Sequence, residues 1–256
     1  MPYHAEYRTL WIDAGYKPDM GSACAVKPPP PGWLAAYHFV SLESALDDIK
    51  NGHIKVARIS EANDPFEFAG LTGDKKFPSA KRAIKRWKNE AIQKIGMLCF
   101  SKDWTSPALW AHYSSRHKGI CRGFWIREEK LLHVVYDTER TAIGYPNFRL
   151  SDGTKKLLFT VKAQDWSYEE EVRYRVELHE TIERKGRRFF KFDGTLKLSE
   201  VILGERCKKT TVEDVRSLLV REKYPNVAVF QARSAFGFFK MVPDEKTIPP
   251  KGSAAY

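Results

Sequence analysis

The sequence predicts an α+β fold with a mostly antiparallel mixed sheet. Segments patterned as strands outnumber those patterned as helices, and the two kinds do not alternate as they would in a doubly wound parallel fold. Of the 256 residues, 43% are hydrophobic and 13% are aromatic. This apolar content supports a packed core and excludes an intrinsically disordered chain. The length fits one large domain or two small ones, and we expect a single domain over residues 33–242.

The two ends of the chain have the composition of extended segments. Residues 1–32 are punctuated by glycine and proline and end in four prolines followed by Gly32, which predicts an extended arm. Residues 243–256 include two consecutive prolines near their middle, and we expect them to form a flexible tail.

In the first half of the domain, helix and strand signals follow each other closely. Residues 33–40 have the pattern of a short buried strand, and Ser41 is a suitable N-cap for a helix that Asn51-Gly52 ends. Residues 53–59 alternate as a strand, and Asn63-Asp64-Pro65 predicts a turn. The next predicted elements are a basic helix from Ser79 to Gly96, a strand at 97–100, a helix from Ser106-Pro107 towards Gly119, and strands at 120–126 and 133–136.

The second half is predicted to be richer in strands. Between 172 and 178, apolar residues alternate with polar ones, as in a half-buried strand. The other predicted elements are helices at 155–163 and 211–222 and strands at 188–192, 201–203, 227–232 and 237–242.

The net charge of +11 comes from two segments. Residues 75–94 hold eight basic residues against one acidic residue, and residues 183–191 hold five against one, so the rest of the chain is neutral. Clustered lysine and arginine bind polyphosphates by releasing counterions, so we expect contact with nucleic acid unless these segments are only solvated surfaces. The candidate nucleic-acid-binding residues are Lys81, Arg82, Lys85, Arg86 and Lys88 in the first segment and Arg187 and Arg188 in the second.

The sequence favours a cytoplasmic protein without a bound metal. No stretch approaches the roughly 18 apolar residues that span a bilayer, and the N-terminus lacks the basic and apolar parts of a signal peptide. The four cysteines are scattered and form no C-x-x-C pair. That spacing favours neither a disulfide framework nor a zinc site.

The common catalytic and nucleotide-binding signatures are absent. The sequence contains no G-x-x-x-x-G-K-[ST], G-x-G-x-x-G, G-x-S-x-G or H-E-x-x-H motif. One remaining candidate is His38, which lies in an apolar strand immediately before a helix. A histidine there is more often a core residue bonded to a backbone carbonyl, but side chains at strand ends also line ligand sites.

Two further features are candidate sites. Trp110 and Tyr113 share one face of a predicted helix, where aromatic rings either pack in the core or stack on a planar ligand. Glu169 and Glu171 are predicted to point the same way along an extended segment. Two like charges on one face are costly unless Arg173 or a ligand compensates for them, although an exposed acidic turn would serve equally well.

Several short motifs also occur in a fixed order. They are Tyr37-His38, Asn63-Asp64-Pro65-Phe66-Glu67, Cys99-Phe100-Ser101, residues 109–113 (LWAHY), residues 117–121 (HKGIC), residues 166–173 (WSYEEEVR) and residues 201–204 (VILG). Over residues 37–204 this arrangement resembles a large bacterial and phage family long filed as a domain of unknown function. Its layout is similar to that of the ADP-ribosyltransferase superfamily, which includes toxins and abortive-infection proteins.

The resemblance implies a split-sheet ADP-ribosyltransferase-like core with peripheral helices and NAD as a substrate. By this resemblance His38 would bind the ribose next to nicotinamide, and Tyr113 or Trp110 would stack near nicotinamide. Glu171 would be the catalytic glutamate, and Glu169 would orient the acceptor nucleophile. The Asn63-Asp64 turn would contribute to NAD binding, and Arg173, with Arg175 or Arg58, would supply cations for the pyrophosphate.

The resemblance also implies a toxin or phage-defence effector that modifies nucleic acid, RNA in particular, or protein. An antitoxin or another inhibitory protein would then be a partner. Two alternatives remain open: a nuclease that uses His38, His112 and the glutamates, and a non-catalytic nucleic-acid-binding protein.

Overall fold

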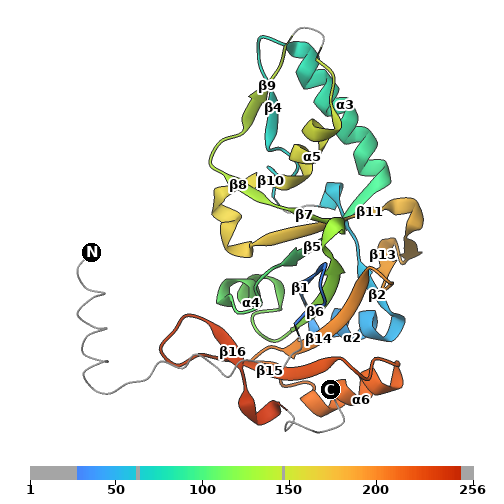
Figure 1. Cartoon of the computed structure of the whole chain (residues 1–256), viewed down its shortest axis with the longest axis vertical. Helices are drawn as coiled ribbons and strands as arrows, with labels where there is room; N and C mark the ends of the chain where they lie inside the picture. The colour runs from blue at the N-terminus through green and yellow to red at the C-terminus, as the bar shows by residue number, and fades with distance from the viewer. Residues whose placement is uncertain (1–27, 62–63, 146–147, 249–256) are drawn as a thin grey trace, which may run out of the picture.

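The computed structural model describes residues 28–61, 64–145 and 148–248, which form an α+β fold around one large sheet (Figure 1). Within these residues the sheet has nine strands, and β3 (Ala57–Arg58) pairs with β5 beside the main path. The main path is β16 (Met241–Pro243), β15 (Ala228–Ser234), β14 (Leu196–Leu203), β6 (Ile120–Arg127), β1 (Trp33–Val40), β5 (Ile95–Ser101), β11 (Glu171–Glu177) and β7 (Leu131–His133). Neighbouring strands are antiparallel except β14 and β15. The predicted mixed α+β class and mostly antiparallel sheet are therefore confirmed.

The large sheet divides between β1 and β5. All eight residues of β1 pair with β6, whereas the register between β1 and β5 consists of Tyr37 opposite Ser101. Ser101 in turn lies opposite Glu171 of β11. Cross-strand partners point to the same face of a sheet, so Tyr37, Ser101 and Glu171 form one row across the division.

The two faces of the sheet are covered by different elements. On the face opposite Glu171, Phe100, Phe124 and Val172 belong to the largest apolar cluster. The helices α2 (Leu42–Asn51) and α6 (Val212–Arg221) pack on this face over β6 and β14. On the face of Glu171, α4 (Pro107–Tyr113) packs Trp110 against Phe39 of β1.

Local sequence signals place the ends of α2 as predicted. The hydroxyl of Ser41 accepts a hydrogen bond from the amide of Ser44 at the first turn. Gly52 follows the helix with a φ of 61°, a left-handed conformation that glycine adopts without steric cost. Within the described residues, no helix is long and apolar enough to cross a membrane.

Other predicted boundaries differ because neighbouring strands determine them. The expected strand at 53–59 is two short strands, since β2 (His53–Lys55) pairs with β13 (Arg187–Lys191) while β3 pairs with β5. The basic helix α3 (Pro78–Lys94) starts without a side-chain cap and ends where β5 begins. The helix α4 ends at Tyr113, because residues 115–117 have positive φ.

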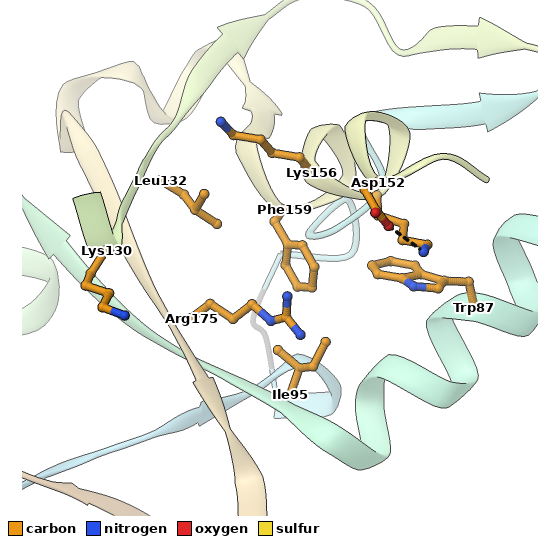
Figure 2. A pocket seen from close by; sticks show the side chains of 9 residues that line it. Trp87, Ile95, Lys130, Leu132, Asp152, Lys156, Phe159 and Arg175 are labelled. Carbon is orange, nitrogen blue, oxygen red and sulfur yellow. Dashed lines mark hydrogen bonds and ion pairs between the residues drawn. The ribbon is translucent and has the colours of Figure 1, made fainter. Parts of the chain in front are cut away.

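The expected helix at 155–163 is displaced towards the N-terminus. It is α5 (Asp152–Thr160), and residues 161–163 form β10 (Val161–Ala163), which pairs with β8 (Val135–Asp137). Figure 1 shows α3 and α5 beside each other at one end of the molecule and α6 at the other. A pocket of about 440 Å³ lies between α3, α5 and the β7–β11 edge of the sheet (Figure 2).

Part of the segment expected to be a flexible tail is packed against the domain. Strand β16 extends to Pro243, and a guanidinium nitrogen of Arg216 in α6 donates to the carbonyl of Thr247 at 2.8 Å. Residues 249–256 of that tail and residues 1–27 of the expected arm lie outside the described residues.

A buried ion pair ties α2 to the sheet. Arg122 of β6 is fully buried, and its Nη1 donates to Oδ2 of Asp48 in α2 at 2.7 Å. Burial raises the pKa of Asp48 to about 6, although the guanidinium opposes this shift. A buried pair contributes little net stability, but loss of one partner leaves the other charge without compensation.

We expect Asp48→Ala to lower the free energy of unfolding by about 3–5 kcal/mol, because Arg122 then stays buried without its carboxylate. The double variant Asp48→Leu/Arg122→Met should recover most of this loss, since it removes both charges. Urea unfolding at pH 7, followed by circular dichroism, measures both changes. A loss below about 1 kcal/mol in Asp48→Ala, the range of an exposed pair, would contradict this role.

Candidate functional site

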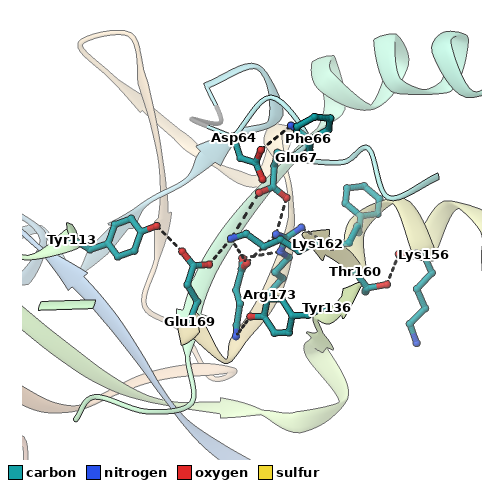
Figure 3. Close-up of polar contacts among 12 residues, drawn as sticks. Asp64, Phe66, Glu67, Tyr113, Tyr136, Lys156, Thr160, Lys162, Glu169 and Arg173 are labelled. Atoms are coloured by element: carbon teal, nitrogen blue, oxygen red, sulfur yellow. Dashed lines mark hydrogen bonds and ion pairs between the residues drawn. The ribbon is translucent and has the colours of Figure 1, made fainter. Parts of the chain in front are cut away.

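Five charged side chains meet beside the start of β11, and we call them the charged cluster. They are Glu67, Lys162, Glu169, Glu171 and Arg173 (Figure 3). Glu67 follows the turn at Asp64, Lys162 lies in β10, and Arg173 lies in β11. Three carboxylates against two cations leave the cluster with a net charge of −1.

Glu171 is the centre of the charged cluster. It is the first residue of β11 and is 5% exposed. Nε and Nη2 of Arg173 donate to its two carboxylate oxygens at 2.7 and 2.9 Å, and Lys162 donates at 2.9 Å. The backbone amide of Glu171 donates to the hydroxyl of Tyr136 at 2.7 Å. The position of this carboxylate is therefore fixed by bonds on both of its oxygens.

Glu169 reaches the same lysine from a different backbone conformation. The segment expected to be extended is a 3₁₀ helix, η3 (Gln164–Glu169), and Glu170 has a left-handed φ of 44°. This bend brings Oε2 of Glu169 into a hydrogen bond with Lys162. Its other oxygen, Oε1, accepts from the hydroxyl of Tyr113 at 2.5 Å. The two glutamates converge because Lys162 holds both, rather than because they alternate along a strand.

Arg173 links the cluster to the surrounding chain. It is 1% exposed, and its guanidinium also contacts Oε1 of Glu67 at 2.7 Å and donates to the carbonyl of Phe159 at 2.7 Å. Its charge is thus used to hold Glu171 and Glu67 in place.

The sequence pattern does not indicate Lys162 or Tyr136 as site residues. Lys162 belongs to a segment with a helical pattern, and its side chain reaches the glutamates because that segment is a strand. The signal for Glu67 was its place in the Asn63–Glu67 motif.

The ion pairs favour the charged forms of Glu171, Lys162 and Arg173. Burial alone would raise the pKa of Glu171, but Arg173 and Lys162 outweigh it and hold that pKa at about 2. Burial would likewise lower the pKa values of Lys162 and Arg173, yet the glutamates raise both above their usual ranges. Burial and the hydrogen bond to Glu169 raise the pKa of Tyr113, so the phenol stays protonated as a donor.

One side of the charged cluster is open to solvent. Cys99 of β5 lies opposite Arg173 in the register and points to the same face, yet the residue is exposed. Tyr113 is half-buried on this face, and Tyr168 beside it packs its ring on His112 at a centroid distance of 6.0 Å. The opening beside Cys99 and these aromatic rings provides an approach to the glutamates.

The structure places His38 and Trp110 away from this opening. The ring of His38 contacts Phe100 on the opposite face, and its Nδ1 lies 3.2 Å from the carbonyl of Cys99. Burial and the neighbouring Arg122 lower the pKa of His38 to about 3, so it is neutral. Trp110 is fully buried, with its Nε1 donating to the carbonyl of Trp104 at 2.7 Å. Of the two aromatic candidates, Tyr113 is the one next to the charged cluster.

Of the two predicted turn residues, the structure describes Asp64. Asn63 lies outside the described residues. Asp64 is 8% exposed, and its Oδ1 accepts from the amide of Phe66 at 2.8 Å, which shapes the turn that carries Glu67. Its contact in the structure is therefore within the turn.

The candidate nucleic-acid-binding residues lie on two different elements. On α3, Lys81, Arg82, Lys85 and Arg86 are exposed, whereas Lys88 is partly buried and its pKa is lowered by burial and by Arg140. In the second segment Arg187 is exposed, but Arg188 pairs with Glu183 at 2.9 Å. The exposed cationic surface is thus larger on α3.

A second group of ionisable side chains lies beneath α2. Ligand atoms of Asp47, Asp48 and His53 come within 4.8 Å of one another, the spacing of a metal site. Arg122 already contacts Asp48 at 2.7 Å, and Arg184 lies 3.8 Å from Asp47. The two guanidinium groups compensate the carboxylates, so ion pairing accounts for this arrangement.

Comparison with protein-family models, with curated proteins and with solved structures finds no match for this chain. The charged cluster and its surroundings are therefore the basis for a functional proposal.

We expect Glu171→Gln to destabilise the fold in a pH-dependent way. The pKa of Glu171 is depressed in the folded protein, so its ionised form contributes stability above pH 4–5 that is lost as the pH falls towards 2. The difference in unfolding free energy between wild type and variant should be about 3 kcal/mol at pH 7 and shrink steadily below pH 5. Urea titrations at pH 7, 5, 4 and 3 measure it.

The matched control is Glu43→Gln, which changes an exposed glutamate of α2. It should differ from wild type by less than about 0.5 kcal/mol at every pH. A Glu171→Gln effect of constant size from pH 7 to pH 3 would contradict the proposed ion pairing.

Proposed function

We propose that this protein is an NAD-dependent ADP-ribosyltransferase whose reaction takes place at the charged cluster. The observation that carries the proposal is the pair Glu169 and Glu171, both bonded to Lys162, with Glu171 at the first position of β11. That placement agrees with the resemblance, which implies a catalytic glutamate at the start of a late strand within an E-x-E pattern. The division of the sheet between β1 and β5, beside Glu171, is a second point of agreement.

The chemistry of the cluster fits cleavage of the nicotinamide–ribose bond. As the bond from C1′ of the ribose to nicotinamide breaks, nicotinamide leaves with the electron pair and the ribose gains oxocarbenium character. A preorganised negative charge next to that carbon stabilises the transition state. The net charge of −1 and the small exposure of Glu169 and Glu171 meet this requirement.

Both glutamates retain capacity to bind the substrate. A carboxylate offers about four lone-pair sites, and Glu171 receives three donors while Glu169 receives two. Glu171 can therefore accept from a ribose hydroxyl, and Glu169 is the better placed of the two to take the proton of the attacking nucleophile. The nucleophile then forms the new bond to C1′ as its proton passes to Glu169.

Tyr113 is the aromatic residue that best fits a role beside nicotinamide. Its ring is half-buried on the open side of the cluster, and its hydroxyl holds Glu169. Tyr113 can stack on a planar ring and orient the Glu169 carboxylate at the same time. His38 has no part in this proposal, because it contacts the opposite face.

The acceptor that we propose is nucleic acid, with RNA favoured, and a toxin or phage-defence role follows from the resemblance. The exposed cations of α3 support a polyanionic acceptor. Among the alternatives, a nucleic-acid-binding protein without catalysis has the same support. A nuclease that uses His38, His112 and the glutamates has less, because His38 contacts Phe100 on the face opposite the glutamates.

We expect purified protein to transfer label from NAD to RNA, single-stranded DNA or a protein in a bacterial lysate. Glu171→Gln should lower the transfer rate by roughly 10²–10³-fold, because it removes charge that stabilises the transition state. Glu43→Gln is the control and should retain full activity. Intact NAD with every acceptor, in wild-type protein, would refute the transferase, and RNA cleavage without NAD would favour the nuclease.

Tyr113→Phe should distinguish stacking of the ring near nicotinamide from orientation of Glu169 by the hydroxyl. The variant keeps the ring but loses the hydroxyl that orients Glu169, so kcat should fall about tenfold while KM for NAD changes by less than about twofold. Initial rates at varied NAD concentration measure both constants. An unchanged kcat would exclude a contribution from the hydroxyl, and a large rise in KM alone would indicate that it binds NAD instead.

A further inference from the structure

We propose that the pocket between α3 and α5 binds a nucleotide, with the base against Trp87 and the phosphate among Lys130, Lys156 and Arg175. None of these residues belongs to the charged cluster. The proposal goes beyond the transferase function and does not depend on it, because it concerns binding alone.

The apolar part of the pocket presents an aromatic surface. Trp87 of α3, Phe159 of α5, Leu132 and Ile95 line it (Figure 2). The rings of Trp87 and Phe159 meet edge to face, with centroids 5.4 Å apart, and Phe159 is 4% exposed. Trp87 is held by this contact and remains partly exposed. A ring fixed in this way can stack on a flat ligand with little loss of side-chain entropy.

The polar part of the pocket is strongly cationic. Four basic side chains line it, namely Lys130, Lys155, Lys156 and Arg175, against the single carboxylate of Asp152. Asp152 already pairs with Lys155 at 2.8 Å, and Arg175 pairs with Glu177 at 2.5 Å. Among the described residues, no carboxylate lies within 4 Å of the ammonium group of Lys130 or Lys156. At least two cations are thus available to an anion.

The combination selects a ligand with a flat ring and more than one negative charge. In Figure 2 the guanidinium of Arg175 lies beside the Phe159 ring, Lys130 and Lys156 stand at two separate edges of the pocket, and Trp87 stands at a third. The volume of about 440 Å³ is within the range of small-molecule sites. A nucleotide joins an aromatic base to a phosphate over a short distance, so it matches both parts of the pocket. A simple aromatic carboxylate would leave most of the positive charge without compensation.

The exposed cations of α3 lie outside the pocket. Trp87 belongs to the same helix as the exposed Lys81, Arg82, Lys85 and Arg86. At 100° per residue they project from the side of α3 opposite Trp87, and none of them lines the pocket. The cations that a ligand in the pocket would meet are therefore the pocket's own, and the lengths of the two probes in the test decide between a strand and a free nucleotide.

The test is binding of a fluorescein-labelled rU12 oligonucleotide, measured by anisotropy between 50 and 300 mM salt, with UMP as competitor. Lys130→Ala/Lys156→Ala should weaken rU12 binding at least tenfold at 100 mM salt. It should also lower the slope of log K against log salt by about 1.4, the value for two lost phosphate contacts on a single strand. The matched control is Lys208→Ala/Lys209→Ala, an exposed pair before α6 at the other end of the molecule. It should change affinity less than twofold.

Trp87→Phe provides a second measurement that does not rely on charge. Wild-type tryptophan fluorescence should be quenched by rU12, and the variant should lose most of the quenching. Tighter binding of rU12 than of UMP assigns the pocket to a strand, and equal affinity assigns it to a free nucleotide. Absence of binding by both probes, or equal loss in the two double-lysine variants, would overturn the proposal.

Discussion

The compensation of three neighbouring carboxylates within the protein is the constraint on which this site depends. An isolated buried carboxylate would take up a proton rather than keep its charge. Arg173 and Lys162 compensate the carboxylates: Arg173 contacts Glu67 and Glu171, and Lys162 lies within 4.0 Å of all three glutamates. The residues come from the turn after Asp64, from β10, from η3 and from β11, so charge compensation holds together segments that are far apart in the sequence. The short strand β10 positions Lys162 beside Glu169 and Glu171.

The same constraint explains how the divided sheet stays ordered. The row of Tyr37, Ser101 and Glu171 joins the two parts of the sheet at one register position. Beyond it the strands separate, and Nδ1 of His38 lies within hydrogen-bond distance of the carbonyl of Cys99. This contact satisfies a strand carbonyl where the β1–β5 ladder has ended. His38 is thus a residue of the sheet junction, and the separation leaves Cys99 exposed on the other face, beside Glu171.

The excess positive charge is compensated to different extents in the two basic segments. In the second segment Arg184 and Arg188 lie close to Asp47 and Glu183, so part of the charge is compensated locally. On α3 the basic residues stay exposed, and the apolar side of the helix contributes Trp87 to a pocket whose other walls add further cations. This pocket lies on the face of β11 that carries Glu171 and Arg175.

Local composition and spacing were enough to predict the α+β class, the caps of α2 and the two basic segments. They also singled out Glu169, Glu171 and Tyr113, which lie together in the structure. The sequence did not determine the division of the sheet, the end of α4 or the displacement of α5, since pairing with distant strands sets these limits. It also missed Lys162, which follows a helical pattern but is drawn into a strand by pairing with β8. Which charges meet depends on the tertiary fold, because charge compensation is a property of side chains brought together from remote parts of the chain.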